Sequence, residues 1–334
     1  MKEYTVAILG ATGAVGCEMR KVLEEYQVPV KELRLLASAR SAGSTLPFRG
    51  REVTIQEATD ESFSGCDFVL GAVEGEMSRR FAPAIKKSGA VYIDNSSAFR
   101  LDPQVPLVVP EINGADALEN HGLIANPNCC TIIALMAVAG IAKLSPIQTM
   151  VVCTYQAVSG AGQAGIAELD AQMKALAAGE KPEVKTFAAQ IAMNVIPFID
   201  APYGNDYTKE EMKMQNEGRR ILHSPELKVN CTCVRVPVMR SHSIAVTLRT
   251  ERKVSVEEAK AAVAAFPGVR LSEDYEGRCY PTPLDTSDQD LVWVGRIRED
   301  LTDEKGLTLW CCGDQIRKGA ASNAVQILQK LIAD

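Results

Sequence analysis

Residues 5–16 read TVAILGATGAVG, an apolar run followed by three evenly spaced glycines. The run at 5–9 is continuous and rich in β-branched residues, which is typical of a strand buried on both faces of a parallel sheet. The glycines allow a tight turn, and a helical pattern of apolar residues follows at 17–26. Strand, glycine turn and helix predict the first unit of a doubly wound parallel sheet.

Similar apolar runs predict four more strands of this sheet, at residues 31–37, 68–72, 91–94 and 107–109. The pattern changes after residue 128, where a long helix is expected from Thr131. Beyond it, strands are expected at 149–155, 229–237 and 243–249, and helices at 162–178 and 209–222. Helices on one face of a mixed sheet are the expected arrangement.

We therefore predict an α/β protein with two domains. The first is a doubly wound Rossmann-type domain over residues 1–128, completed by a C-terminal helix within 315–334. The second is an α+β domain with a mixed sheet over residues 129–314.

Composition excludes several classes of protein. The chain has 334 residues, of which 46% are hydrophobic and 23% charged, with a formal net charge of -6. This is an ordinary globular composition, and without a basic block it gives no indication of binding to nucleic acid or to a membrane. The apolar stretch 132–144 is too short to span a bilayer, and no signal-peptide pattern begins the chain. The sequence predicts a cytoplasmic protein.

The chain has ten cysteines and three histidines, without a paired C-x-x-C motif. Neither a disulfide framework nor a metal site is expected from this pattern. Most of the cysteines should pack as small buried hydrophobic residues.

The glycine turn is a candidate cofactor loop, made of Gly10, Ala11, Thr12, Gly13, Ala14, Val15 and Gly16. Its backbone could approach a pyrophosphate closely, and the free N–H groups of the helix start would bind the anion. An ordinary turn between a strand and a helix would have the same sequence appearance.

The end of the second predicted strand indicates which dinucleotide binds. NAD enzymes place an acidic residue here to hold the ribose hydroxyls. This chain has Ser38, Arg40 and Ser41, whose guanidinium and hydroxyls suit a 2′-phosphate. We predict NADP over NAD, with an arginine that merely lies in solvent as the alternative.

Residues 125–131 read ANPNCCT and precede the long apolar helix. Asn128 is a candidate N-cap, and Cys129 would lie in the first turn, where the helix dipole favours a thiolate. Such a thiolate could form a thioester that accepts or releases hydride. Alternatively both cysteines simply pack, and Cys130 is the better candidate for packing.

A thiol nucleophile needs a base, and His242 is the best candidate among the three histidines. His121 is expected in a surface turn and His223 at the end of a charged helix, whereas His242 comes just before an apolar strand. A purely structural histidine would have the same sequence context.

Taken together, these segments resemble the aspartate-semialdehyde dehydrogenase family, at both ends and in the middle of the chain. The matching segments are the glycine loop, SARSAG at 38–43, NSSAFR at 95–100, PNC at 127–129, TYQAVSGAG at 154–162, EEMK at 210–213, Arg235 with His242, and KGAASN at 318–323.

The resemblance implies roles for the matching residues. Cys129 is the implied nucleophile, His242 the acid and base, and Gln156 the group that orients the acyl group. The implied substrate-binding residues are Arg100, Asn128, Glu210, Lys213 and Arg235. Besides the glycine loop and Ser38, Arg40 and Ser41, the implied cofactor-binding residues are Asn95, Ser159, Gly160 and Asn323.

The chemistry of these side chains agrees with such roles. Arg100 and Lys213 can neutralise a phosphate, and Arg235 can bind a carboxylate through two parallel hydrogen bonds. Glu210 can pair with an ammonium group. On spacing alone, however, Glu210 and Lys213 form an ordinary exposed helical ion pair.

The implied reaction is the NADPH-dependent reductive dephosphorylation of L-aspartyl 4-phosphate to L-aspartate 4-semialdehyde. It is reversible and phosphate-dependent, and it belongs to lysine (through diaminopimelate), threonine and methionine biosynthesis. The resemblance also implies a homodimer or homotetramer, with the second domain carrying catalysis and dimerisation.

Two alternatives remain open. A reductase similar to N-acetyl-glutamyl-phosphate reductase would act on a substrate without a free ammonium, so Glu210 would have no partner in it. A catalytically inactive, dehydrogenase-like binding protein should lack the nucleophile or the base, and this chain has candidates for both.

The sequence departs from the family pattern at two places. Cys130 stands where the family usually has Ser, Ala or Thr, and it adds a second thiol that could react or be oxidised. Glu74 and Glu76 follow the third strand, where the family tends to have Ser-Ala-Gly-Gly. These carboxylates could weaken NADP binding or could point to solvent.

Overall fold

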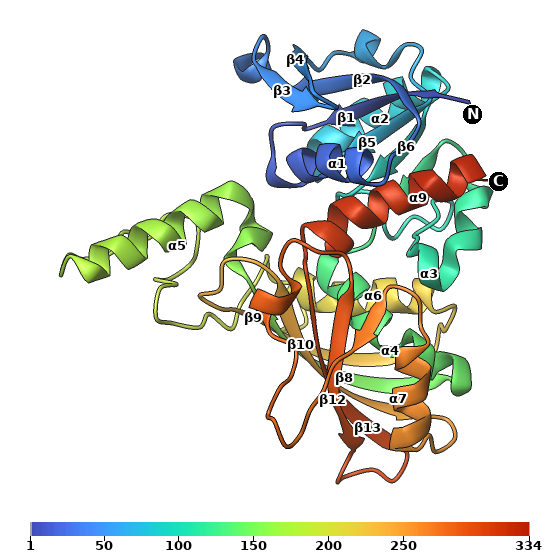
Figure 1. Cartoon of the computed structure of the whole chain (residues 1–334), viewed down its shortest axis with the longest axis vertical. Helices are drawn as coiled ribbons and strands as arrows, with labels where there is room; N and C mark the ends of the chain where they lie inside the picture. The colour runs from blue at the N-terminus through green and yellow to red at the C-terminus, as the bar shows by residue number, and fades with distance from the viewer. Residues whose placement is uncertain (1, 334) are drawn as a thin grey trace. The chain divides into compact units, whose positions relative to one another are not determined.

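A computed structural model describes residues 2–333, which form two compact units. The first unit comprises the chain up to Asn128 together with the segment from Ala320 onward, and the second comprises Cys129–Gly319. Figure 1 shows the elements of each unit along the chain.

The first unit is built on a seven-stranded sheet in the order β3-β4-β2-β1-β5-β6-β7. All neighbouring strands are parallel except β3 and β4, which form an antiparallel hairpin at one edge. The strands are β1 (Tyr4–Leu9), β2 (Val30–Ala37), β3 (Thr45–Phe48), β4 (Arg51–Glu57), β5 (Phe68–Gly71), β6 (Val91–Asp94) and β7 (Leu123–Ala125).

Helices cover both faces of this sheet, because alternate residues of the central strand β1 are buried in two different cores. Val6 and Ile8 pack in the core formed with α1 and α9, whereas Ala7 and Leu9 pack in the core formed with α2. The helices of the unit are α1 (Ala14–Glu25), α2 (Gly75–Lys87), α3 (Pro110–Asn113) and α9 (Ser322–Ala333), with short 3-10 turns at η1 (Ala39–Ser41), η2 (Asp60–Phe63) and η3 (Gly114–Glu119).

The prediction of a strand at residues 107–109 is wrong. This segment makes only a single bridge between Leu107 and Ala125, and β7 is the strand that pairs with β6. The side chain of Asn113 bonds the Leu107 carbonyl and the Val109 N–H, and Asn323 donates to the Val108 carbonyl. The segment bonds β7 through the backbone at Ala125 alone, and side-chain amides bond the Leu107 and Val108 carbonyls and the Val109 N–H.

The second unit contains a six-stranded mixed sheet in the order β11-β12-β13-β10-β8-β9. The β8–β9 and β11–β12 pairs are parallel and the others are antiparallel. The strands are β8 (Ile147–Gln156), β9 (Lys228–Arg235), β10 (His242–Thr250), β11 (Val269–Leu271), β12 (Val292–Glu299) and β13 (Gly306–Gly313).

Three helices, α4, α6 and α7, pack against this sheet, and α4 is buried along almost its whole length. α5 instead projects from the sheet (Figure 1) and packs its Leu169 against Val158 and Ile191 in a small separate core. The helices are α4 (Cys129–Leu144), α5 (Gly162–Ala177), α6 (Lys209–Ile221), α7 (Val256–Ala264) and α8 (Pro283–Thr286), with a 3-10 turn at η4 (Val158–Ala161) and a π-helical turn at η5 (Arg317–Ala321).

The fold class expected from the sequence is confirmed: a doubly wound Rossmann-type unit and an α+β unit with a mixed sheet. At the C-terminal end, the second unit extends to Gly319 rather than 314, because β13 and the turn after it remain part of it. Within residues 2–333 no helix is both long and apolar enough to cross a membrane.

Candidate active site

Cys129 is the first residue of α4 and follows directly on Asn128. Backbone N–H groups at a helix start have no partner within the helix, so the first turn favours a negative charge. Cys129 is half-buried, whereas Cys130 is only 1% exposed. The burial of Cys130 agrees with the expectation that it packs, and Cys129 is the thiol that a substrate could reach.

His242 contacts the Cys129 sulfur from the first residue of β10. The distance from Cys129 Sγ to His242 Nε2 is 3.5 Å, and the His242 side chain is completely buried. On the other side of the ring, the N–H of Ala157 donates to Nδ1 over 3.0 Å. Because Nδ1 accepts this bond, the neutral ring carries its proton on Nε2, the nitrogen that faces the sulfur.

The two adjacent thiols have opposite pKa shifts. A hydrogen bond from Cys130, together with the charge and hydrogen bond of His242, holds the pKa of Cys129 well below the usual thiol value, although burial raises it. Burial, and the hydrogen bond and charge shared with Cys129, raise the pKa of Cys130 well above that value. Cys129 is therefore the thiolate of the pair, and thiolates are the reactive form of cysteine.

A chain of polar contacts runs from the end of β8 to the first turn of α6. Thr154 Oγ1 donates to Gln156 Oε1 over 2.9 Å, and Gln156 Nε2 donates to Glu210 Oε1 over 3.2 Å. Lys213 then bonds both Glu210 Oε2 at 2.8 Å and Asp200 Oδ2 at 2.9 Å. Burial lowers the pKa of Lys213, but the two carboxylates outweigh it and leave the pKa raised, so this lysine is charged.

Arg235 is the last residue of β9 and pairs in register with Gln156. Its side chain is 7% exposed, and Nη1 donates to the Ala157 carbonyl over 2.7 Å. The guanidinium lies 5.9 Å from the centre of the Phe187 ring. Burial lowers its pKa, and within residues 2–333 no carboxylate lies in ion-pair distance of it. A buried cation in this state is able to bind an anionic ligand.

Two glycines keep backbone close to the reactive groups. A Cβ on Gly160 would lie 2.8 Å from Arg235 Nη1 and 3.3 Å from His242 Cε1. A Cβ on Gly319 would lie 2.9 Å from the Cβ of Cys129. Neither position has room for a larger residue without displacing a member of the site.

The expected residues of the first unit form a separate network. Arg100 donates from Nε to the Asn126 carbonyl over 2.9 Å and from Nη2 to the Asn95 carbonyl over 2.6 Å. Asn126 Nδ2 donates to Asn95 Oδ1, and Asn323 Nδ2 donates to Asn126 Oδ1 over 2.7 Å. Asn323 is completely buried and also bonds Val108, so its amide nitrogen is used inside the unit.

The glycine loop has the geometry of an anion-binding turn. Gly10 has a φ of +90°, and a Cβ at this position would overlap the Ala72 carbonyl oxygen. Thr12 and Gly13 are exposed just before α1 begins, and the Gly13 N–H donates to the Gly10 carbonyl over 3.1 Å. Arg40 is exposed in the turn directly after β2. Glu74 and Glu76 are also exposed, where α2 begins.

The structure thus brings Cys129, Gln156, Glu210, Arg235 and His242 together in the second unit. Sequence reasoning missed the backbone N–H of Ala157 and the close approach of Gly319. A main-chain donor has no side-chain signature, and only the KGAASN segment at 318–323 pointed to the glycine.

Cys129, Cys130 and His242 also have donor atoms within 4.8 Å of one another, the one such trio of possible metal ligands among residues 2–333. A structural zinc site needs four ligands, and the chain supplies three here.

Comparison with known proteins follows the same division of the chain. A family profile for the semialdehyde dehydrogenase NAD binding domain matches residues 5–121, and one for the semialdehyde dehydrogenase dimerisation domain matches residues 138–318. The chain is 49% identical to an aspartate-semialdehyde dehydrogenase of Synechocystis, across 98% of this chain and 97% of that protein.

Two further similarities cover the full length. An aspartate-semialdehyde dehydrogenase of Bacillus subtilis is 46% identical, across 98% of this chain and 96% of that protein. The crystal structure of aspartate semialdehyde dehydrogenase II from Vibrio cholerae, complexed with ASA, superposes with a TM-score of 0.98 at 44% identity, across 100% of this chain and 99% of that one. The chain therefore belongs to the aspartate-semialdehyde dehydrogenase family.

Proposed function

We propose that this protein reduces L-aspartyl 4-phosphate to L-aspartate 4-semialdehyde with NADPH, releasing phosphate, through a thioester on Cys129. The observation that carries the proposal is the pair of Cys129 Sγ and His242 Nε2, 3.5 Å apart at the start of a helix. Such a pair supplies a nucleophile that is ionised near neutral pH.

In the proposed reaction, the Cys129 thiolate attacks the acyl carbon and the bond to phosphate breaks. NADPH, when bound, supplies the hydride that reduces the thioester carbonyl. The sulfur then leaves as thiolate when the tetrahedral adduct collapses to the aldehyde. His242 faces the sulfur through a protonated Nε2, so it can stabilise the thiolate before attack and again as it leaves.

The polar groups near Cys129 suit the other charges of the substrate. Arg235 is buried without an ion pair among residues 2–333, which supports a bidentate contact with the α-carboxylate. Glu210 is 8% exposed and would pair with the α-ammonium, as Gln156 orients the acyl group. The ammonium contact favours aspartyl phosphate over an N-acetylated substrate. We assign the phosphate to Lys213 and Arg100, with Asn128 as a further substrate contact.

The residues of the first unit fit NADP. Gly10 and Gly13 allow a close backbone approach, and the N–H groups at the start of α1 would bind the pyrophosphate. Arg40 is exposed in the turn after β2, and residues 38–44 of that turn include no acidic residue that would repel a 2′-phosphate. Ser159 and Gly160 remain candidate cofactor contacts. For Asn323 we propose a supporting role, since its amide nitrogen bonds Asn126 and Val108.

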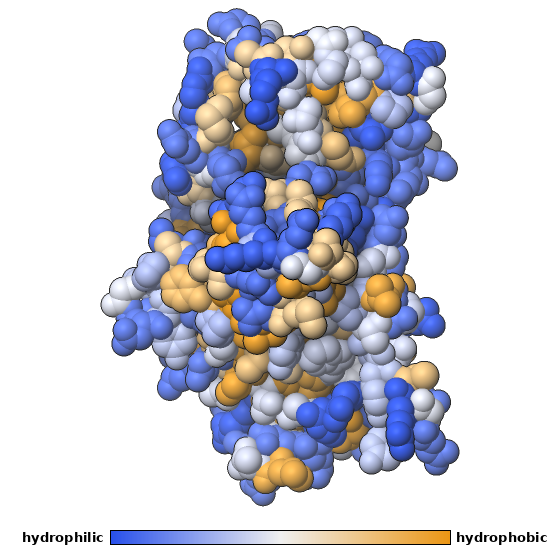
Figure 2. Space-filling view, turned by 90° about the vertical axis from the view of Figure 1, so that its left-hand side faces the viewer, coloured by the Kyte–Doolittle hydropathy of each residue, from blue (hydrophilic) through white to orange (hydrophobic). Residues whose placement is uncertain are grey.

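We further assign cofactor binding to the first unit, and catalysis and subunit contact to the second. The chain matches a dimerisation-domain profile, so the second unit is an oligomerisation domain. One face of its sheet is left open: Val151 is 51% exposed and Tyr155 39% exposed, although both lie in a central strand. Apolar side chains are also exposed on and after α5, among them Met173 and Phe198, and Figure 2 views the molecule from this side. We propose a homodimer that acts in amino-acid biosynthesis in the cytoplasm.

The deciding experiment measures NADP reduction with the semialdehyde, with and without inorganic phosphate, for the wild type and for Cys129→Ser. The wild type should require phosphate. Cys129→Ser should lose nearly all activity, because an alkoxide is hard to form near neutral pH. Turnover by Cys129→Ser at the wild-type rate would remove the thioester from the mechanism. Failure of the wild type both in this assay and in NADPH oxidation with L-aspartyl 4-phosphate would favour a binding protein without catalysis.

A further inference from the structure

The residue before the reactive histidine has an unusual backbone conformation. Ser241 is completely buried and has a φ of +71°, in the left-handed region that residues with a side chain rarely adopt. Glycine would take this conformation at lower cost. What serine adds at this position is a hydroxyl group, and the surroundings of that group indicate its use.

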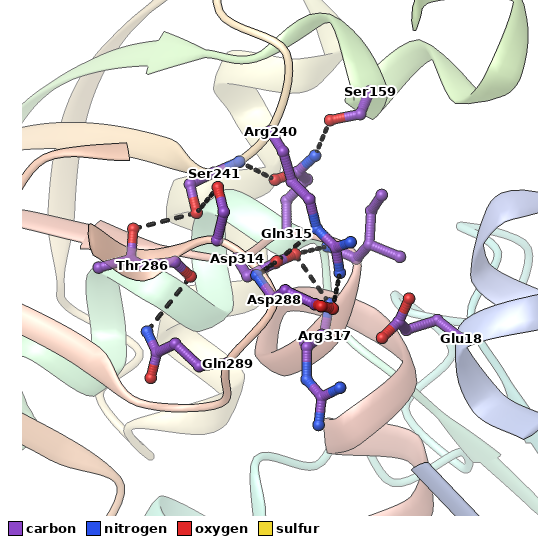
Figure 3. A network of polar contacts seen from close by, with 12 residues as sticks. Glu18, Ser159, Arg240, Ser241, Thr286, Asp288, Gln289, Asp314, Gln315 and Arg317 are labelled. Carbon is purple, nitrogen blue, oxygen red and sulfur yellow. Dashed lines mark hydrogen bonds and ion pairs between the residues drawn. The ribbon is translucent and has the colours of Figure 1, made fainter. Parts of the chain in front are cut away.

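Three side chains bond Ser241 (Figure 3). The Thr286 hydroxyl donates to Ser241 Oγ over 3.0 Å, the Ser287 hydroxyl lies 3.4 Å from the same oxygen, and Gln315 Oε1 accepts the Ser241 N–H over 2.8 Å. The Gln315 amide also donates to the hydroxyl of Ser159. Thr286, Gln315 and Ser159 are 4% exposed or less, so water does not compete for their bonds.

The preceding residue, Arg240, is fixed by a buried carboxylate. Arg240 Nε lies 2.5 Å from Asp314 Oδ2, and the same oxygen accepts the N–H of Asp288 over 2.7 Å. Asp314 Oδ1 accepts the N–H of Ile316 over 2.8 Å, and the Asp314 side chain is completely buried. Asp314 follows Gly313, which pairs in register with His242. The turn before His242 is therefore tied to the end of the neighbouring strand β13.

We propose that Ser241 is a positioning residue for His242, held by the Thr286 hydroxyl and supported by the Arg240–Asp314 pair. The left-handed turn sets the direction in which β10 begins, and with it the line from His242 Nε2 to Cys129 Sγ. If the turn relaxes, the ring moves off the sulfur and the thiolate loses a hydrogen bond. The inference rests on the proposed function only in taking Cys129 and His242 as the reactive pair.

The test compares the pH dependence of Cys129 alkylation by iodoacetamide in the wild type, Ser241→Ala and Thr286→Val. It uses the full chain without substrate or NADPH. Mass spectrometry with fragmentation must locate the adduct, because Cys130 is adjacent. The pH midpoint of Cys129 alkylation should be higher in both variants than in the wild type. At a fixed pH below both midpoints, alkylation of a variant should be about tenfold slower than that of the wild type for each pH unit by which its midpoint is raised. In turnover, kcat should fall with little change in the KM for substrate.

Thr247→Val is the matched control. Thr247 lies in the same strand as His242, and the change removes a hydroxyl that contacts Thr308 Oγ1 of β13 at 3.1 Å. Its alkylation profile should overlay that of the wild type. Profiles of Thr286→Val and Ser241→Ala that also overlay the wild type would overturn the proposal. Should Ser241→Ala fail to fold, Thr286→Val decides alone, because it leaves the left-handed residue unchanged. A wild type that alkylates as expected but shows no turnover would count against the proposed function and not against this inference.

Discussion

Cys129 and Cys130 are neighbours with the same side chain, yet their surroundings push their pKa values in opposite directions. Cys129 receives a hydrogen bond from Cys130 and another from His242, and both favour the thiolate. Cys130 is buried next to that negative charge, and both conditions favour its thiol form. The second thiol, which the sequence left as a source of doubt, therefore supports the ionisation of the first.

This difference predicts how the two thiols respond to pH. An ordinary cysteine has a pKa of about 8.5, and a lowered pKa keeps the thiolate present below that pH. Alkylation of Cys129 should therefore have its midpoint below the ordinary value. Cys130→Ser keeps a hydrogen-bond donor and should change the midpoint little, whereas Cys130→Ala removes the donor and should raise it. An alkylation profile of Cys130→Ala identical to the wild type would show that the donor has no effect.

The proximity of Cys129 and His242 could be anticipated, because reactive thiols at helix starts need a partner and the chain has only three histidines. The groups that orient them could not. Ala157 acts through a main-chain N–H and Gly319 through the absence of a Cβ. Ser241 acts through its backbone angle. None of these contributions depends on a residue type that a sequence pattern identifies.

At the scale of single elements, we propose that β2 and the turn after it determine which cofactor is preferred. β2 pairs in parallel with β1, so its carboxyl end lies beside the glycine loop, where dinucleotide enzymes bind the adenosine ribose. The turn presents Arg40 to solvent and contains no carboxylate. A cation here is suited to a 2′-phosphate and gains nothing from a free 2′-hydroxyl.

Arg40→Asp should therefore weaken the use of NADPH while leaving NADH little affected. A hydrogen bond to a charged group contributes ~1.5–3 kcal/mol, so kcat/KM for NADPH should fall roughly tenfold to hundredfold. Steady-state kinetics with both cofactors measures this. Arg51→Asp, the same charge change at an exposed position of β4, is the control and should leave the NADPH preference intact. Equal losses in both variants would assign the effect to net charge alone.

The elements that could be predicted most directly from sequence are those with nearly unbroken apolar runs, such as β1 and α4. β12 was not predicted. Its register with β13 shifts between Gly295 and Arg298, and Arg296 has a φ of +55°, so the alternation of its side chains is interrupted. The segment at 107–109 failed for the opposite reason: its apolar run is real, but side-chain amides satisfy its backbone.

At the scale of the whole molecule, the open face of the six-stranded sheet carries exposed apolar side chains, which indicates that another protein surface covers it. Along β8 the side chains alternate between buried and accessible, and the accessible series includes Val151 and Tyr155. The Tyr155 ring lies 5.5 Å from the Trp310 ring of β13. Large apolar side chains on a central strand are usually covered, and a second copy of the chain would cover them in a symmetric dimer.

Val151→Arg should accordingly convert the proposed dimer to monomer or weaken it strongly, because an interface on this face would bury a charge without a partner. Sedimentation velocity over a range of protein concentrations measures the change. Leu301→Arg makes the same replacement at a fully exposed apolar residue outside the sheet and should leave the mass unchanged. A Val151→Arg variant that sediments like the Leu301→Arg variant would place the interface elsewhere.

The return of the chain to its first unit affects how the protein must be synthesised. α9 supplies Val325, Ile327 and Leu328 to the core that it shares with α1, yet it is synthesised only after the whole second unit. Translation proceeds at roughly 5–20 residues per second, and the apolar side of α1 stays uncovered until α9 has been made. The second unit is one uninterrupted stretch and can complete its fold earlier. A nascent chain released before α9 would present that uncovered side to chaperones and proteases.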